Sequence, residues 1–378
     1  MTVLFTPLDV GDVTIANRIG MSAVSRNRAD PSRVPNDIMK KYYLQRALGG
    51  AGLIVTEATL ISPQGFIPAQ HDRSPGIWNM EQVAGWRRIT NVVHLAGSKI
   101  YCQLWHVGRL SNSDAKAGPV YGPSAVPARG GRGSDRFNFL PESPGFRMPT
   151  EIPDPLLFVQ LFKNAANNAK LAGFDGVELH AADGFLVHQF LDSTSNVRTD
   201  KWGGSPQNRA RFGLEVLKSL VDVFGSNVSL KVSPAGGQND IGMPLEDTIE
   251  TFSYFLSEAD KLKLSYITLA RYLPHMDPII DGNKRGTPHD PVSTYGKLIN
   301  NSRTFLVGGL SPEEAEELVK TGQVDGVFFG IPWVTHPDLA KRIRHGKRLD
   351  NVVAMPHLYG DVNVDPCRGY TDYPAVTY

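Results

Sequence analysis

The chain has 378 residues, of which 41% are hydrophobic and 20% are charged. This composition is ordinary for a globular protein and excludes intrinsic disorder as its main state. The 39 basic and 38 acidic residues leave a formal net charge of +1, so the chain lacks the basic character of a dedicated nucleic-acid-binding protein. Two cysteines, Cys102 and Cys367, are too few for a disulfide framework or a four-thiolate zinc site. We expect a reduced, cytoplasmic protein.

The sequence shows no sign of membrane attachment. It has no run of about 18 apolar residues, and no basic segment followed by an apolar stretch stands at its start. Its last residues carry no lipidation or peroxisomal signal. We expect no contact with a membrane or with nucleic acid, and a chain that binds a small-molecule substrate as a monomer or homodimer.

Short apolar runs alternate with amphipathic stretches along the whole chain. In chain order, the runs expected to form strands are 19–24, 52–56, 100–105, 176–179, 228–232, 266–269, 304–307 and 326–329. The stretches expected to form helices are 37–48, 81–95, 155–171, 207–223, 245–259, 312–321 and 337–344. Within 155–171, for example, apolar residues recur every three or four positions, which is typical of one face of a helix.

This alternation predicts parallel βαβ units. Eight runs favour closure into an α/β fold of the (β/α)8 TIM-barrel type over an open, doubly wound sheet, whose strands number about six. We expect a single domain over residues 1–378. Two segments lie outside the repeat: 107–150, a long excursion after the third strand that is a candidate lid, and 346–378, a C-terminal extension. The glycine-rich part at 129–133 is more simply explained as a surface loop.

In such a barrel, chemistry takes place at the carboxyl ends of the strands. The polar or aromatic residues found there are Ser25, Glu57, Gln103, Trp105, His180, Asp183, Lys231 and Arg271. Gly308, Gly309 and Gly330 follow the last two strands, where backbone N–H groups can approach a phosphate. His180 and Asp183 fit a general acid–base pair, a metal pair or a substrate clamp. Because no further cluster at metal-ligand spacing accompanies them, no metal is expected.

At these residues the sequence resembles the old yellow enzyme family of flavin-dependent ene-reductases. The densest match is Gly-Phe-Asp-Gly-Val-Glu-Leu-His at 173–180, followed by the run 190–212, which contains Asp-Ser-Thr-Ser-Asn and Trp-Gly-Gly-Ser-Pro. Shorter matches include Asn17-Arg18, Thr56-Glu57-Ala58, Gln103-Leu104-Trp105 and Pro123-Ser124-Ala125. The resemblance covers essentially the whole chain. It implies an FMN-binding barrel that takes hydride from NADPH or NADH and delivers it to an activated alkene.

The resemblance also implies which residues meet the flavin. Carried over position by position, they are Ala23, Val24, Ser25, Ala58, Gln103, Lys231, Gly308, Gly309, Gly330 and Ile331. Ser25 can donate to the flavin O4, Gln103 offers its amide to the pyrimidine edge, and Lys231 supplies positive charge near N1 and O2. The residues expected to contact substrate are Trp105, Arg271 and Tyr359.

Three positions depart from the family's pattern. The family usually has His-x-x-Asn or His-x-x-His where this chain has His180 and Asp183, and both side chains donate to a carbonyl or nitro oxygen. An ionised Asp183 only accepts hydrogen bonds, so it helps only if it is protonated or if the ligand is cationic. Phe185 replaces the tyrosine that protonates the α-carbon, and His188 is the one neighbouring candidate to replace it. Ile331 replaces the arginine that binds the FMN phosphate.

The sequence leaves three functions open, and His180, Asp183 and Phe185 are the catalytic positions that distinguish them. The first is NAD(P)H-linked reduction of an activated C=C bond in a specialised substrate. The second is a redox-neutral isomerisation or cyclisation on the same scaffold, because Phe185 cannot protonate the intermediate. The third is ligand binding without catalysis, which the retained Gln103, His180 and Lys231 disfavour.

Overall fold

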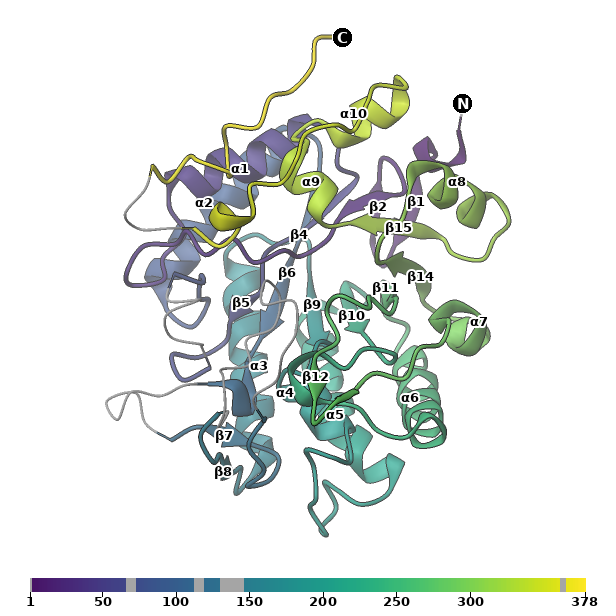
Figure 1. Ribbon diagram of the computed structural model, residues 1–378. Coiled ribbons are helices and arrows are strands. Elements are labelled where there is room, and N and C mark those ends of the chain that lie inside the picture. Colours follow the sequence, from purple (N-terminus) through teal and green to yellow (C-terminus); the bar gives the residue numbers. More distant parts are fainter. Residues whose placement is uncertain (1, 66–72, 112–118, 130–145, 361–364) are drawn as a thin grey trace.

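The computed structural model describes residues 2–65, 73–111, 119–129, 146–360 and 365–378. Its centre is a closed barrel of parallel strands (Figure 1). The barrel strands are β3 (Ile19–Met21), β4 (Leu53–Val55), β6 (Lys99–Trp105), β9 (Gly176–Ala181), β10 (Val228–Val232), β11 (Tyr266–Ala270), β14 (Arg303–Val307) and β15 (Gly326–Phe329). Each pairs in parallel with the next in this order, and β15 pairs with β3, which closes the circle. The predicted (β/α)8 barrel is confirmed, and every strand overlaps its predicted run.

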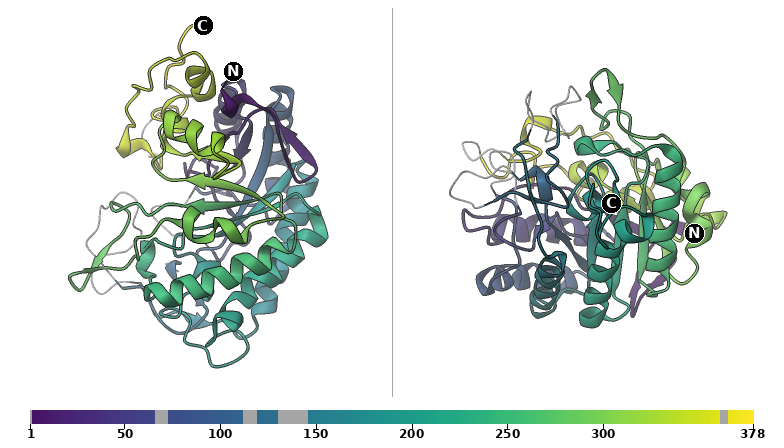
Figure 2. Two further views of the ribbon diagram at one scale, coloured as in Figure 1. Left: turned by 90° about the vertical axis from the view of Figure 1, so that its right-hand side faces the viewer. Right: turned by 90° about the horizontal axis from the view of Figure 1, so that it is seen from below.

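Helices cover the outside of the barrel, as two further views show (Figure 2). They are α1 (Asp37–Leu48), α2 (Met80–Leu95), α3 (Pro155–Leu171), α5 (Pro206–Phe224), α6 (Leu245–Asp260), α8 (Pro312–Lys320) and α10 (Leu339–Arg344). Local chemistry sets where they begin: Asn79 and Gln82 form a capping box at α2, and Ser205 caps α5 just before a proline. Within the described part of the chain, no helix is both long and apolar enough to cross a membrane.

Short elements occupy the connections, and the sequence did not predict them. They are β1 (Leu8–Val10), β2 (Val13–Ile15), β5 (Thr59–Leu60), β7 (Tyr121–Gly122), β8 (Thr150–Glu151), α4 (Leu186–Leu191), β12 (Ile279–Ile280), β13 (Asn283–Lys284), α7 (Pro291–Tyr295) and α9 (Ile331–Thr335). The β1–β2 hairpin packs Leu8, Val10 and Ile15 against Tyr101 and Phe305 inside the barrel. Apolar side chains thus fill the amino-terminal end of the barrel, and the opposite end is left for the site.

The excursion 107–150 lies partly outside the described residues, at 112–118 and 130–145. Its described parts contain β7 and β8, which pair in parallel. In the C-terminal extension, residues 361–364 also lie outside the described residues.

Arginine side chains fix this extension to the barrel. Arg26 is fully buried and donates to the carbonyls of Leu358 and Gly369. Arg28 donates to further main-chain carbonyls of the same segment. Because guanidinium groups offer several donors in a fixed geometry, they hold a segment that has little regular structure. The segment that they hold carries Tyr359.

Candidate active site

A cavity of about 360 Å³ opens where the barrel strands end, and its size is typical of a small-molecule site. All of the residues expected to contact the flavin line it. They are joined by the three catalytic candidates and by two of the expected substrate contacts, namely His180, Asp183, Phe185, Trp105 and Tyr359. The structure therefore brings nearly the whole predicted site into one space.

One wall of the cavity consists of main chain and small residues that follow β14, β15 and β3. Gly308 and Gly309 have positive φ angles of 126° and 67°, which residues with a Cβ atom rarely adopt. A Cβ atom on Gly308 would lie 2.9 Å from Arg271 Cβ, so space as well as backbone conformation requires glycine there. Because glycine has no side chain to cover them, the main-chain N–H groups of this wall are open to an anion.

The parallel register places the side chains of β6 and β9 next to each other inside the barrel. Gln103 is level with Glu178, and its Nε2 donates to Glu178 Oε1 at 2.8 Å. Glu178 is 2% exposed, and burial raises the pKa of its carboxyl group. Since the amide nitrogen of Gln103 is engaged by Glu178, its amide oxygen is left to accept a hydrogen bond from a ligand N–H.

The next pair along the barrel combines His180 of β9 with Lys231 of β10, which are level in the sheet and both line the cavity. Burial lowers the pKa of His180 to about 3, so its imidazole is neutral near pH 7. Lys231 Nζ lies 3.7 Å from Asp183 Oδ2, and His180 Nε2 lies 3.8 Å from the same oxygen. Burial opposes ionisation of Asp183, but Lys231, the two nearby histidines and the Ser233 hydroxyl together outweigh it, and the pKa of Asp183 is lowered. Asp183 is therefore a carboxylate and not a neutral donor.

The turn after β9 sets the direction of Asp183. This residue has a φ of 58°, in the left-handed region, and Gly184 follows with a φ of 76°. The Asp183 N–H donates to Ser233 Oγ at 2.8 Å, and its carbonyl accepts from Asn239 Nδ2 at 2.7 Å. Among residues other than glycine, Asp and Asn adopt this conformation most readily. The backbone conformation thus suits Asp and Asn equally, and the two residues differ here in charge and hydrogen-bonding capacity.

Phe185 stands at the position of the family's proton donor. Its ring is edge-on to both Trp105 and His180, with centroids 5.0 Å apart in each case. His188, the candidate replacement, packs edge-on against Phe252 and is absent from the described lining of the cavity. Burial lowers the pKa of His188 to about 4. Neither side chain can therefore deliver a proton to a ligand in the cavity.

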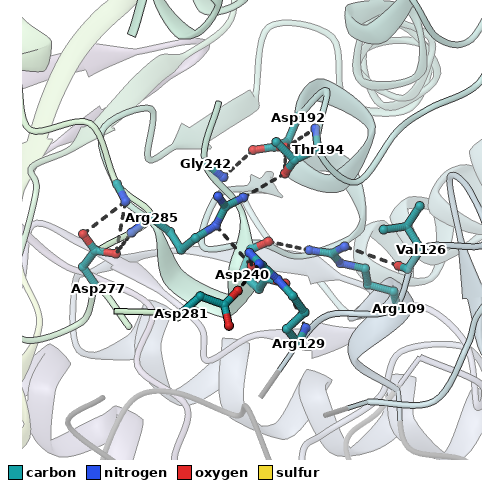
Figure 3. Close-up of polar contacts among 11 residues, drawn as sticks. Arg109, Val126, Arg129, Asp192, Thr194, Asp240, Gly242, Asp277, Asp281 and Arg285 are labelled. Carbon is teal, nitrogen blue, oxygen red and sulfur yellow. Dashed lines mark hydrogen bonds and ion pairs between the residues drawn. The ribbon is translucent and has the colours of Figure 1, made fainter. Parts of the chain in front are cut away.

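An ion-pair network joins the loops at the rim of the cavity (Figure 3). At its centre, the Asp240 carboxylate accepts from both the main-chain N–H and the guanidinium of Arg129, and Arg285 Nε lies 3.1 Å away. Arg109 Nη2 donates to the Asp240 carbonyl at 2.6 Å. The network thereby ties together the loops that follow β6, β10 and β11. The neighbouring Asn239 extends it to the turn after β9.

Arg271 is the one expected substrate contact that the structure does not bring to the cavity. Its Nη1 pairs with Glu314 Oε1 of α8 at 2.6 Å, and it is absent from the described lining. Its Cβ lies next to Gly308, 2.9 Å from where a Cβ of that residue would be. Trp105 and Tyr359 line the cavity, and burial raises the pKa of Tyr359 to about 12.

Several lining residues had no signal in the sequence. They are Gln238, Asn239, Leu273, His275 and Met276, from the loops after β10 and β11. Loop residues follow no period, so pattern alone does not place them. Glu178 also went unnoticed as the partner of Gln103. Its alternation with His180 along β9 puts both on the inner face of the barrel, and that signal was available.

One side of this cavity is a main-chain wall open to an anion, and the other is a row of fixed polar side chains. This arrangement is typical of a flavin-dependent barrel oxidoreductase. Comparison with known proteins agrees. Residues 3–350 match the NADH:flavin oxidoreductase / NADH oxidase family, and the chain belongs to this family.

Individual relatives extend over nearly the whole chain. NADP-dependent oxidoreductase lnbE of Aspergillus flavus is 38% identical over 99% of this chain and 96% of its own. Chanoclavine-I aldehyde reductase fgaOx3 of Penicillium roqueforti is 36% identical, with the same coverage of 99% and 96%. Among solved structures, morphinone reductase superposes with a TM-score of 0.84 at 33% identity, over 99% of this chain and 96% of that one. The protein is an old yellow enzyme family member that uses FMN, with NAD(P)H as reductant.

The residues of the cavity fit FMN, with one exception. The Gly308–Gly309 main chain offers an approach for the phosphate, the amide oxygen of Gln103 suits an N–H of the ring, and Lys231 offers positive charge. Ile331 is the exception, because it removes a charge-assisted hydrogen bond of roughly 1.5–3 kcal/mol. When bound, FMN supplies hydride transfer between the nicotinamide and the substrate.

Proposed function

We propose that this protein reduces the activated C=C bond of an α,β-unsaturated carbonyl compound, and that water protonates the α-carbon. One observation carries the proposal: Phe185 fills the place of the acid without offering a proton, while Gln103, His180 and Lys231 still line the cavity. The reductase names of its relatives support the same reaction class.

Each residue of the cavity has a role in this proposal. The neutral imidazole of His180 donates to the carbonyl oxygen and draws electrons from the C=C bond, which makes the β-carbon electrophilic. Trp105 and Tyr359 pack against the substrate. Asp183 accepts a hydrogen bond from the substrate. A positioned general acid contributes typically about 10²–10⁴-fold, so the protein without one is expected to reduce simple enones slowly.

The test is Phe185→Tyr. We expect the variant to reoxidise its reduced flavin with cyclohexenone at least several-fold faster than the wild type in single-turnover measurements. Phe224→Tyr, which adds a hydroxyl to a ring outside the described lining of the cavity, is the matched control and is expected to behave as wild type. If the wild type reoxidises as fast as Phe185→Tyr, the missing acid does not limit the reaction and the proposal of water as proton source is wrong.

A second candidate function rests on the same residue. If hydride returns before the α-carbon is protonated, the net result is a redox-neutral isomerisation or cyclisation. NADPH consumed per product formed separates the two functions: reduction consumes one equivalent, and an isomerase needs only enough to reduce its flavin once. The Phe185→Tyr variant is then expected to form a reduced product from the substrate that the wild type isomerises.

The remaining expectations complete the proposal. The described parts of 107–150 act as a cap on the cavity of a single domain, a role that the rim network supports, and 346–378 is a C-terminal extension that brings Tyr359 to the cavity. NADPH is favoured over NADH by the name of the NADP-dependent relative. We place the protein in the cytoplasm as a monomer or homodimer, without a nucleic-acid partner.

A further inference from the structure

We infer that Asp183 recognises a positive charge on the substrate, and that the substrate is an enone or enal with a protonated nitrogen two or three bonds from its carbonyl group. This inference rests on the proposed function only in that it places the ligand in the same cavity. It adds a substrate class that the reductase chemistry does not require.

The first support is that position 183 has no conformational reason to be Asp. Its φ of 58° suits Asn equally well, its main-chain contacts to Ser233 and Asn239 involve no atom of its carboxylate, and the Ser233 hydroxyl that also contacts its side chain could donate to an Asn oxygen as well. An Asn here would offer a neutral N–H₂ donor to a carbonyl oxygen. The Asp instead removes that donor and adds a negative charge in the cavity. A carboxylate would repel the charge that develops on a carbonyl oxygen, so a ligand group of opposite sign suits this position better.

The second support is the distance of Asp183 from its cationic neighbours. Lys231 Nζ and His180 Nε2 lie 3.7 and 3.8 Å from Oδ2, beyond the range of a direct hydrogen bond. The side chain of Asp183 is 22% exposed, whereas that of Lys231 is 11% exposed. The carboxylate therefore remains accessible from the cavity, and Lys231 is expected to serve the flavin.

The third support is that His180 and Asp183 complement each other. The imidazole is neutral and buried, and its Nδ1 has no hydrogen-bond partner within the described structure. One ring nitrogen can donate to a carbonyl oxygen while the adjacent carboxylate accepts from an N–H group. Because Nε2 and Oδ2 are 3.8 Å apart, the acceptor and the cation of the ligand must be close together. An amino ketone or amino aldehyde has this arrangement.

A ligand pair of equal shape tests the inference. 1-(Dimethylamino)pent-3-en-2-one carries a protonated amine next to its ketone at slightly acidic pH, and 6-methylhept-2-en-4-one has a CH in place of the nitrogen. Their dissociation constants are measured by calorimetry on the oxidised, FMN-loaded enzyme without nicotinamide. We expect the wild type to bind the cation about tenfold or more tightly than the neutral ketone, as a charge-assisted hydrogen bond predicts.

Two variants assign that preference to one carboxylate. Asp183→Asn is expected to remove or reverse it while folding normally, because Asn fits the backbone. Asp281→Asn is the matched control: Asp281 also has a positive φ, of 51°, but its side chain is 79% exposed and absent from the described cavity lining. This variant is expected to keep the preference of the wild type.

The outcomes separate recognition from a purely structural role. If Asp183 merely neutralises Lys231, Asp183→Asn will change the affinity for both ligands by the same factor, and the inference fails. It also fails if the wild type shows no preference. Because binding is measured without turnover, a negative result with Phe185→Tyr leaves this experiment unaffected, and the two proposals can fail independently.

Discussion

The two sides of the cavity are built in different ways. The flavin side, which we propose as the binding place of FMN, consists of main chain after β14 and β15, exemplified by Gly308, and of side chains such as Gln103 and Lys231 that strand register holds in place. The substrate side, which we propose as the place of the substrate, combines Trp105 and His180 on strands with Asp183 and Phe185 on a turn that hydrogen bonds from other loops support. The difference suggests how one barrel can keep its cofactor while its chemistry changes, because substitutions at Asp183 and Phe185 leave the strands untouched.

Breaking the flavin side is expected to have the largest effect. Lys231→Met removes a buried positive charge and leaves the carboxylate of Asp183 without this compensating charge in the cavity. We expect FMN affinity to fall by about 100-fold, on the scale of hydrogen bonds to charged groups. Titration of the apoprotein with FMN, followed by flavin fluorescence, measures this change. Lys201→Met, on an exposed lysine, is the control, and an affinity within threefold of the wild type in Lys231→Met would contradict the prediction.

The substrate side is expected to respond most to acid. Burial holds the pKa of His180 near 3 and that of His188 near 4, whereas an unfolded histidine titrates near 6.5. The unfolded state therefore takes up protons first, so the stability contributed by each neutral histidine is complete above pH 6.5 and is lost below it. Between pH 7 and pH 5 this loss amounts to about 2 kcal/mol for each residue.

His188→Leu tests this pH dependence without touching the described lining of the cavity. The difference in free energy of unfolding between pH 7 and pH 5, measured with urea, is expected to shrink by about 2 kcal/mol. His345→Leu, on an exposed histidine, should leave that difference unchanged. An equal difference in His188→Leu and wild type would mean that His188 does not remain neutral in the folded protein.

The smallest expected effect comes from restoring a phosphate contact on the flavin side. Ile331 lines the cavity and opens α9, at the position where the family places its phosphate-binding arginine. Ile331→Arg is expected to tighten FMN binding by about tenfold, measured by calorimetry on the apoprotein. Ile331→Met, which adds length without charge, should bind FMN as the wild type does. A tenfold gain in both variants would point to packing in place of charge.

The flavin side could be predicted from the sequence because strands set it. Strand ends are visible as apolar runs, and a residue such as Lys231 or Gln103 keeps its place whatever the loops do. The resemblance supplied the assignments, and the register supplied the physical reason. Even here one residue was overlooked: alternation along β9 places Glu178 on the inner face of the barrel, but it does not show that Glu178 accepts a hydrogen bond from Gln103 on the neighbouring strand.

The substrate side could be predicted only in part. Asp183 and Phe185 follow a strand directly, so their position was evident, but the ionised state of Asp183 depends on Lys231 from another strand. Arg271 also follows a strand directly, yet it pairs with Glu314 on α8 and is absent from the described lining of the cavity. The rim network around Asp240 joins loops that are distant in sequence, so neither periodicity nor composition indicates it.

The attachment of the C-terminal extension affects how this enzyme can diversify. Arg26 and Arg28 bind that segment through its carbonyl groups, which every amino acid carries. The segment adds a side-chain anchor in Tyr370, which is fully buried, stacks on Tyr42 and lies under both guanidinium groups. We expect that Tyr359 can be exchanged for a larger, smaller or charged residue while these anchors keep the path of the chain. Substitutions at this part of the cavity wall can then change substrate preference without detaching the segment.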